Sequence, residues 1–285
     1  MRDAALKGLA VGFFDGVHLG HREILRGASA ALTFRNHPLT VLAPEKAPRL
    51  IMTCEERVAA IKACGVDEVT VLDFTRQLAE MSAEEFVAQH LSSSVSRLPS
   101  LIRCGANWRF GKGGLGDAAF LRSRGYAVEI VPYAEYKGEP ISSSRIRQCL
   151  ERGAIEDANA MLGRKFQVSG SRFEGKGLGT DMGYPTINLK PETLNLKLPL
   201  GVYEVEVEGV KAIANYGFAP TMSDKAWKTP VLEIHLLGEG AKDVRRETAD
   251  GVSVTLVRYI RPEKKFDSID DLKWQIAADC DTITP

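Results

Sequence analysis

Two histidines near the start of the chain are the residues best suited to chemistry. Residues 11–21 read Val-Gly-Phe-Phe-Asp-Gly-Val-His-Leu-Gly-His and follow an apolar run. His18 and His21 are three positions apart, so a helix that begins here places both imidazoles on one face. Glycines allow a close approach of the backbone, and amides at a helix start attract anions. The segment therefore predicts a phosphate site on a strand–loop–helix element.

Two further segments of the first half carry side chains suited to a bound ligand. Residues 33–38 read Thr-Phe-Arg-Asn-His-Pro at an expected strand end, where the proline stiffens the loop and His37 offers a polar group. Residues 104–111 read Cys-Gly-Ala-Asn-Trp-Arg-Phe-Gly, also after an expected strand. Trp108 and Phe110 would stack on a flat heteroaromatic ligand, unless the two rings fill the core instead.

A third segment offers hydroxyl groups and a guanidinium group. Residues 141–147 read Ile-Ser-Ser-Ser-Arg-Ile-Arg ahead of an expected helix. Hydroxyls and amides at a helix start accept an anion, and Arg147 can form a bidentate pair with phosphate oxygens. A surface helix capped by serine is the alternative interpretation when the segment is taken alone.

A glycine-rich segment in the second half predicts a separate phosphate site. Residues 175–188 read Gly-Lys-Gly-Leu-Gly-Thr-Asp-Met-Gly-Tyr-Pro-Thr-Ile-Asn, without the Gly-Lys-Ser/Thr of a Walker A loop. Its glycines still provide backbone amides for phosphate contact. Thr186 and Asn188 alternate along an extended segment, so their oxygens face one side. Such oxygens suit Mg2+ that shares its coordination shell with nucleotide phosphates, although a plain glycine-rich turn is the alternative.

The elements that must position these residues differ between the two halves. In the first half, expected strands alternate with helices that begin at the capping boxes Thr53–Glu56 and Ser82–Glu85, which predicts a parallel sheet with helices on its faces. The expected strands are residues 7–14, 30–34, 68–72, 101–104 and 127–131. In the second half, short alternating runs predict an antiparallel β-barrel closed by one helix over residues 268–278. These barrel strands are residues 201–208, 211–216, 231–237 and 252–259.

The bulk composition narrows the class of protein. The chain has 285 residues, and 37 lysines and arginines balance 37 aspartates and glutamates, so no overall field favours nucleic acid or a membrane surface. Five scattered cysteines without a Cys-x-x-Cys pair indicate reduced thiols. No apolar run is long enough to span a bilayer. We therefore expect a cytoplasmic protein that acts on small molecules, without an obligate protein partner.

The order of these motifs carries a resemblance to a known family. The series GxFDGxHxGH, TFxxHP, GxNxxFG, ISSxxIR and PTxN, followed by a barrel, resembles the bacterial bifunctional riboflavin kinase/FMN adenylyltransferases, also called FAD synthetases. The resemblance implies a Rossmann-like α/β nucleotidylyltransferase domain over residues 1–158, which converts FMN and ATP into FAD. It implies a β-barrel riboflavin kinase domain with a C-terminal helix over residues 159–285, which converts riboflavin and ATP into FMN. Mg2+ would accompany ATP in both reactions.

The resemblance also implies roles for individual residues. In the nucleotidylyltransferase domain His18 and His21 would be catalytic, and ATP would be bound by Gly12, Phe14, Asp15, Gly16, His18, Gly20, His21, Ser143, Ser144 and Arg147. The flavin would be bound there by His37, Asn107, Trp108, Arg109 and Phe110. In the barrel Glu233 would be the general base that accepts the proton of the riboflavin 5′-hydroxyl. ATP would be bound there by Gly175, Lys176, Gly179, Gly183, Pro185, Thr186 and Asn188, with Thr186 and Asn188 as the metal ligands.

Two other interpretations stay open at this point. Only eleven residues separate His21 from Thr33, where the family has a longer helix and loop, and Asn36 stands where the family usually has a proline. A chain altered in this way would keep a single activity, or would bind flavin as a regulatory protein with weakened catalysis.

Overall fold

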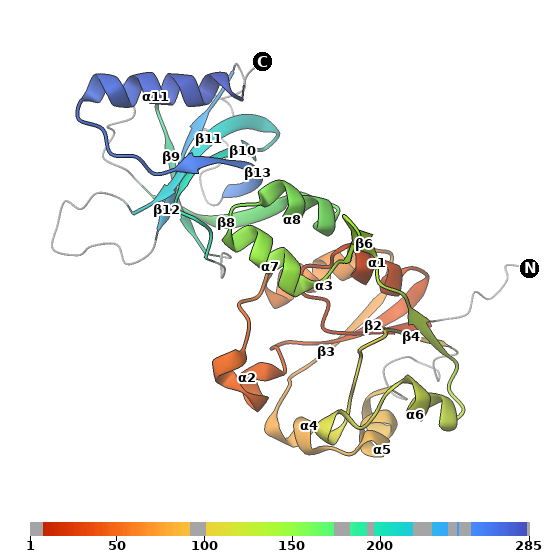
Figure 1. The fold of residues 1–285 in the computed structure, drawn as a ribbon. Coiled ribbons are helices and arrows are strands. Elements are labelled where there is room, and N and C mark those ends of the chain that lie inside the picture. Colours follow the sequence, from red (N-terminus) through yellow and green to blue (C-terminus); the bar gives the residue numbers. More distant parts are fainter. Residues whose placement is uncertain are drawn as a thin grey trace, which may run out of the picture. The chain divides into compact units, whose positions relative to one another are not determined.

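A computed structural model of the chain describes residues 8–91, 101–173, 183–192, 197–218, 230–238, 244 and 252–283. Its contacts divide the chain into two compact units, Met1–Ser143 and Ser144–Pro285, both drawn in Figure 1. Each unit has a sheet of its own, a parallel one in the first unit and an antiparallel barrel in the second. The domain boundary expected after residue 158 stays a prediction.

The first unit is built on a five-stranded parallel sheet, which confirms the fold class predicted for this half. Its strands are β1 (Gly8–Val11), β2 (Ala28–Phe34), β3 (Glu68–Leu72), β4 (Leu101–Gly105) and β5 (Val128–Val131). Their spatial order is β3-β2-β1-β4-β5, so the chain continues on one side of β1 and then crosses to the other. In open parallel sheets ligands bind beyond the carboxyl ends of the strands at such a change of direction.

Helices cover both faces of this sheet because alternate strand residues point to opposite faces. Leu9 and Val11 join a core cluster with residues of α4 (Arg76–Glu80), α5 (Ala83–Phe86) and α6 (Ala118–Ser123). Ala10 lies in a second cluster with residues of α1 (Leu19–Leu25) and α3 (Cys54–Ala63). The shorter elements are α2 (Leu39–Leu42), the turns η1 (Pro44–Lys46), η2 (Val87–Leu91) and η3 (Lys112–Gly114), and the hairpin β6 (Glu135–Tyr136) and β7 (Glu139–Pro140).

Capping boxes fix the starts of α3 and α5, as the sequence predicts. The Thr53 hydroxyl accepts a hydrogen bond from the Glu56 amide at 3.2 Å, and the Glu56 carboxylate accepts one from the Thr53 amide at 2.8 Å. Ser82 and Glu85 form the same two bonds at 3.2 and 2.8 Å. Each box satisfies two amides that a helix start leaves without partners. The box on α3 also fixes the direction of Arg57, one position further along this helix.

The second unit is a closed six-stranded antiparallel barrel, which confirms the second half of the predicted fold. Its strands are β8 (Phe166–Phe173), β9 (Ile187–Pro191), β10 (Gly201–Val207), β11 (Val210–Gly217), β12 (Val231–Leu236) and β13 (Val252–Pro262). They close in the order β10-β11-β12-β9-β8-β13, with β13 paired to β10. Ile187, Leu189, Leu232 and Ile234 are buried, so the residues between them face outward.

Among the described residues, three helices belong to the second unit by their contacts. They are α7 (Ser143–Glu151), apart from its first residue, α8 (Ile155–Leu162) and α11 (Ile269–Asp281). The Asn159 side chain joins α8 to the barrel, since it donates to the Leu256 carbonyl at 2.9 Å and accepts from the Phe166 amide at 2.7 Å. Helix α11 is the closing helix that the sequence predicts, and the Ser268 side chain caps its start.

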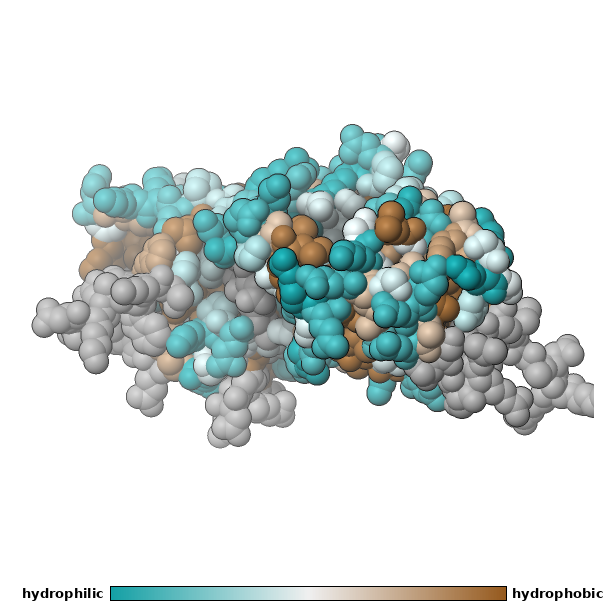
Figure 2. Space-filling model, turned by 90° about the horizontal axis from the view of Figure 1, so that it is seen from below, coloured by the Kyte–Doolittle hydropathy of each residue, from teal (hydrophilic) through white to brown (hydrophobic). Residues whose placement is uncertain are grey.

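The outer surface shows no concentration of one kind of residue on the face drawn in Figure 2, where hydrophilic residues surround several separate hydrophobic areas. In the part of the chain that the structure describes, no helix combines the length and the apolar character needed to cross a bilayer. All five cysteines are free thiols.

Candidate functional site

The two predicted histidines meet at the carboxyl end of β1. His18 is the N-cap of α1, and its Nδ1 accepts a hydrogen bond from the His21 amide at 3.3 Å. The two imidazole rings stack with their centroids 3.6 Å apart and an angle of 17° between their planes. A Cβ atom at Gly20 would lie 3.3 Å from the His18 ring, so the glycine makes room for this stack. The spacing therefore places both rings together, as the sequence predicts.

The loop that carries these rings has a strained and tightly held backbone. Phe14 and Val17 have φ angles of 58° and 41°, a region that bulky and β-branched residues rarely adopt, and both side chains are buried. Gly16 between them has φ of 83°. The Asp15 carboxylate, only 2 % exposed, accepts from the Ile51 amide with both oxygens, at 3.0 and 3.2 Å. Such strain persists only where the surroundings fix the conformation, and it concentrates at functional sites.

Burial keeps both imidazoles neutral at physiological pH. Burial lowers the pKa of His18 to about 4. Burial lowers the pKa of His21 well below its usual value, and the neighbouring His18 and Arg57 lower it further. The buried Nδ1 of His21 has no hydrogen-bond partner among the described residues. The pair can therefore give hydrogen bonds to an anion but contributes no full positive charge.

The end of β2 brings His37 to the same loop. Its Nδ1 accepts a hydrogen bond from the Leu39 amide at 3.2 Å, so a neutral ring carries its proton on Nε2. The His37 ring meets the Phe13 ring edge-on, with centroids 4.9 Å apart and an angle of 82° between their planes. The Thr33 hydroxyl in β2 donates to the Phe13 carbonyl at 2.9 Å. The ends of β1 and β2 are therefore held together at the sheet edge.

The segment after β4 divides the predicted flavin-binding residues into two kinds. Asn107 and Arg109 are exposed, and Trp108 is half-buried. Phe110 is only 6 % exposed and belongs to the hydrophobic core, where it stacks on Trp108 with centroids 4.7 Å apart. Phe110 therefore fills the core, which is the alternative interpretation given above, and it packs against the ring of Trp108.

The serine segment, residues 141–147, contacts the β1–α1 loop through Ser143. The Ser143 hydroxyl donates to the Asp15 carbonyl at 2.9 Å, although 128 positions separate the two residues. Ser144 and Arg147 follow on the same helix, where the Arg147 Nη2 donates to the Ser144 hydroxyl at 3.1 Å.

The barrel brings a second set of polar side chains into one row. Glu233 in β12 is the direct partner of Asn188 in β9 and of Asn215 in β11. Directly paired residues share one face of a sheet with Cβ atoms about 5 Å apart, so these three side chains lie in line on the outer face. All three are half-buried, as is Thr186, two positions before Asn188.

A hydrogen bond fixes the segment that leads into this row. The Pro185 carbonyl lies 3.0 Å from Nδ1 of His235, so His235 carries a proton on Nδ1 and donates it. The ring of Tyr184 meets the His235 ring edge-on, with centroids 5.2 Å apart. Gly183 precedes this segment with φ of 89° in an exposed turn. Gly175, Lys176 and Gly179 lie outside the described residues.

The donor chemistry of the barrel row fits a hard cation that shares ligands with phosphate. In the described ranges, no three or more His, Cys, Asp or Glu side chains gather in a way that could hold a metal ion. Thr186 and Asn188 offer a hydroxyl and an amide oxygen, which suit Mg2+ when nucleotide phosphates complete its shell.

Comparison with known proteins decides between the interpretations left open above. The FAD synthetase family model matches residues 3–145, and the riboflavin kinase family model matches residues 162–284. The bifunctional riboflavin kinase/FMN adenylyltransferase of Escherichia coli (strain K12) is 33 % identical to the chain, over 95 % of the chain and 90 % of that protein. The chain belongs to the bifunctional riboflavin kinase/FMN adenylyltransferase family. Because it carries both domains, it is a transferase with both activities, which supports this interpretation over a single-activity enzyme or a flavin-binding regulatory protein.

Other known proteins are similar to the chain over nearly their whole length. The enzyme of the same name from Bacillus subtilis (strain 168) is 30 % identical, over 95 % of this chain and 89 % of that protein. A crystal structure of a Streptococcus pneumoniae protein named as a macrolide-efflux protein has 29 % sequence identity and a TM-score of 0.83, over 98 % of this chain and 94 % of that chain. The residues matched by the FAD synthetase family model include the segment between His21 and Thr33, which contains the end of α1 and the beginning of β2.

Four residues outside the predicted site lists lie at these two places, namely Asn36, Arg57, Asn215 and His235. His235 lies two positions after Glu233 in the same expected strand, so alternation could have included it, whereas Asn215 reaches the row only through the register of β11 with β12. Asn36 and Arg57 have no such signal, because their contacts come from strands and helices distant in the sequence.

Proposed function

We propose that the chain makes FAD in two ATP-dependent steps, with riboflavin phosphorylated to FMN on the barrel and FMN adenylylated to FAD on the first unit. The observation that supports this proposal is that the stacked imidazoles and the polar row through Glu233 lie in different units. The stacked imidazoles lie at the carboxyl edge of the parallel sheet, and the row through Glu233 lies on the outer face of the barrel.

In the barrel, Glu233 would act as the general base. Its carboxylate would accept the proton of the riboflavin 5′-hydroxyl while that oxygen attacks the γ-phosphorus of ATP and ADP leaves. Asn188 and Thr186 would hold Mg2+ with the ATP phosphates, and the cation would neutralise phosphate charge. Pro185 and Gly183 would shape the ATP site together with Gly175, Lys176 and Gly179. The bond from His235 to Pro185 would keep this segment against β12.

In the first unit, binding and alignment would carry the reaction. A phosphate oxygen of FMN would attack the α-phosphorus of ATP, and pyrophosphate would leave. His18 and His21 would hold the ATP phosphates as neutral hydrogen-bond donors, and Arg147, Ser143 and Ser144 would add charge and hydroxyl groups. The Gly12–Gly20 loop, with Phe14, Asp15 and Gly16, would shape that site.

The flavin of FMN would lie beyond the ends of β2 and β4. Trp108, supported by Phe110, would offer an aromatic face to the isoalloxazine ring, and Asn107 and Arg109 would offer polar groups beside it. His37 would donate a hydrogen bond from Nε2. The proposed compartment is the cytoplasm, where the five free thiols would stay reduced.

Separation of products after incubation tests this function. Purified chain with riboflavin, ATP and Mg2+ is expected to form FMN and then FAD, and with FMN in place of riboflavin it is expected to form FAD alone. Omission of Mg2+ is expected to stop both reactions. FMN without FAD would leave only the kinase, and neither product would leave a flavin-binding protein.

A further inference from the structure

The side chain of Arg57 is the least expected charge in the first unit. It is 0 % exposed, and it lies in the first turn of α3, where the positive end of the helix dipole disfavours a cation. Its Nε and Nη1 have no hydrogen-bond partner among the described residues. No carboxylate of the described residues forms an ion pair with Arg57, although Asp15 and Glu55 attract its charge from further away, and burial of a cation in such a setting is costly. An arginine that is buried with only part of its hydrogen-bonding capacity satisfied points to a role beyond packing.

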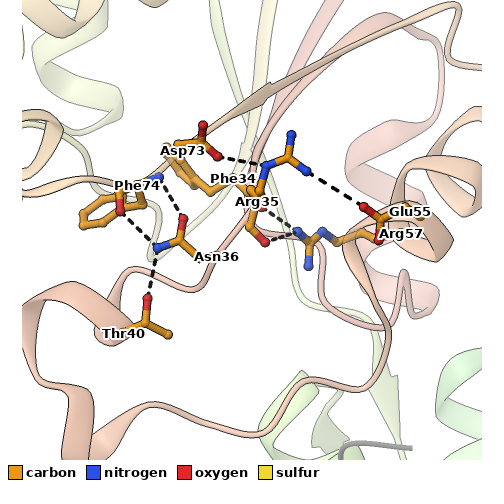
Figure 3. A network of polar contacts seen from close by, with 8 residues as sticks. All are labelled: Phe34, Arg35, Asn36, Thr40, Glu55, Arg57, Asp73 and Phe74. Carbon is orange, nitrogen blue, oxygen red and sulfur yellow. Dashed lines mark hydrogen bonds and ion pairs between the residues drawn. The ribbon is translucent and has the colours of Figure 1, made fainter. Parts of the chain in front are cut away.

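The contacts of Arg57 join the two strand ends that form the candidate adenylyltransferase site. Its Nη2 donates to the Phe34 carbonyl at 2.5 Å and to the Arg35 carbonyl at 3.1 Å, as Figure 3 shows. Phe34 is the last residue of β2, and Arg35 follows it directly. The guanidinium carbon lies 4.3 Å from the centre of the Phe13 ring, in the loop after β1. Phe13 in turn meets His37.

The charge of Arg57 lies beside a site whose histidines are neutral. Arginine keeps its proton even though burial lowers its pKa. In a poorly solvated interior a fixed charge acts over several ångströms, because little solvent screens it. A nucleotide triphosphate at the stacked imidazoles would therefore experience this charge without touching the side chain.

We infer that Arg57 is a positioning residue for adenylyl transfer. It fixes the end of β2, and with it His37, against Phe13 of the β1–α1 loop, and it supplies a permanent positive charge beneath that loop. This inference rests on the proposed roles of His21 and His37.

Three variants of the full chain separate the geometry from the charge. Arg57→Met removes both, Arg57→Lys keeps the charge and reaches one carbonyl, and Phe13→Leu removes the ring but leaves the arginine. The matched control is Arg35→Met, because Arg35 is an exposed neighbour whose ion pairs with Asp73 and Glu55 lie at the surface. FAD formation from FMN is measured as kcat and KM, and FMN formation in the same samples controls for the barrel.

If Arg57 positions the adenylyltransferase site, its removal should lower FAD formation strongly and leave FMN formation unaffected. Arg57→Met is expected to lower kcat/KM for FAD formation about 100-fold, with FMN formation unchanged. Arg57→Lys is expected to have a kcat/KM about tenfold higher than that of Arg57→Met, because lysine keeps the positive charge but lacks the planar guanidinium group. Arg35→Met is expected to stay within about twofold of the parent chain, as surface ion pairs contribute little.

The pH profile of FAD formation distinguishes positioning from packing. Loss of a nearby cation raises the pKa of His21, so His21 becomes protonated at a higher pH. The pH at which FAD formation falls on the acidic side of the profile is therefore expected to be higher in Arg57→Met. It is expected to be unchanged in Arg57→Lys and Phe13→Leu. Asp15, Cys54 and Glu55 face the guanidinium, and His18 faces His21, and all four are unchanged in these variants.

Several results would overturn the inference. One such result is a folded Arg57→Met chain with the kcat/KM of the parent chain. Another is a loss of FAD formation in Arg57→Met with an unchanged pH profile and with no higher activity in Arg57→Lys. If Arg57→Met does not fold, parental FAD formation in both Arg57→Lys and Phe13→Leu would reject it, and a selective loss in both would support it. Absence of FAD formation by the parent chain would instead reject the proposed function itself.

Discussion

The two candidate sites place their polar groups in opposite ways. In the first unit Asp15, His18 and Arg57 are 2 %, 4 % and 0 % exposed and lie around a strained loop. In the barrel, Asn188, Glu233 and Asn215 are half-buried on an outer face. The first arrangement depends on packing from several elements, whereas the second follows from strand pairing alone.

The difference has a consequence for substitutions. A change in the first site disturbs buried polar groups, so it should alter stability and activity together. A change in the barrel row removes a side chain from an outer face, so it should alter activity with little effect on folding. A variant of the first site that alters activity without stability, or a variant of the barrel row that alters both, would contradict the proposed position of that site.

The largest effect is expected from Glu233→Gln in the barrel row. Loss of a general base lowers the rate about 1000-fold, so FMN formation should nearly stop while FAD formation from FMN continues. The free energy of unfolding should change by less than about 1 kcal/mol. Product separation and urea unfolding measure the two quantities.

The control for this variant is Glu206→Gln, since Glu206 also lies on the barrel and pairs with Lys165 at its surface. It should leave FMN formation intact. Substantial FMN formation by Glu233→Gln would remove this residue from the mechanism.

Asp279→Ala tests whether the barrel also has a place where burial matters. Asp279 is 4 % exposed, and its carboxylate accepts from Nε and Nη2 of Arg261 and from Gln275, which ties α11 to β13. Loss of the carboxylate leaves Arg261 without its ion pair, so the second unit should lose about 3 kcal/mol of unfolding free energy. FAD formation from FMN should not change. Thermal unfolding measures this loss of stability. Asp281→Asn removes an exposed carboxylate of the same helix and should have no measurable effect in that measurement.

Local patterns were enough to predict most elements that carry the sites. The His-x-Gly-His spacing placed two rings on one helix turn, and two capping boxes placed the starts of α3 and α5. Alternation along residues 186–188 placed Thr186 and Asn188 toward one side, and β9 keeps Asn188 outward. These signals act over a few residues, so the sequence contains them in full.

Contacts between distant segments could not be predicted in this way. Strand β8 is not among the expected strands, although buried and more exposed residues alternate along Phe166–Ser171; β9 and β13 pair with it on either side. Arg57 has the sequence surroundings of an exposed helix residue, but the packing of α3 against Phe13 buries it. Asn215 joined the barrel row through the register of β11 with β12, which strand patterns alone do not determine.

The stability of the first unit should depend on pH through His18. Its pKa is about 4 in the folded chain and 6.5 in the unfolded chain, so below pH 6.5 the unfolded state binds a proton that the folded state does not. Unfolding free energy should therefore fall as pH decreases from 6.5 to 4, by roughly 3 kcal/mol in total for this group. Urea unfolding across this range measures the slope. His18→Asn keeps an N-cap acceptor without a titrating ring, and it should make the slope smaller, with the contribution of His21 remaining; an unchanged slope would mean that His18 is not buried as described.

The smallest effect should come from Asn36, whose side chain holds the end of β2 to the end of β3. Its Oδ1 accepts from the Phe74 amide at 2.9 Å, and its Nδ2 donates to the Phe74 carbonyl and to the Thr40 hydroxyl, both at 3.0 Å (Figure 3). Asn36→Ala should cost about 1 kcal/mol of stability and raise the KM for FMN about fivefold, because His37 follows directly in the loosened loop.

Thr40→Ala is the comparison variant for Asn36→Ala, since it removes the hydroxyl that accepts from Asn36 and donates to the His37 carbonyl at 2.7 Å, while both bonds between Asn36 and Phe74 remain. It should raise the KM for FMN less than Asn36→Ala does in the same assay of FAD formation, because the two bonds that hold the end of β2 to Phe74 remain. A loss of stability in Asn36→Ala with an unchanged KM would mean that the loop supports the sheet but does not position His37 for the flavin. The candidate adenylyltransferase site would then end at the β1–α1 loop and the end of β4.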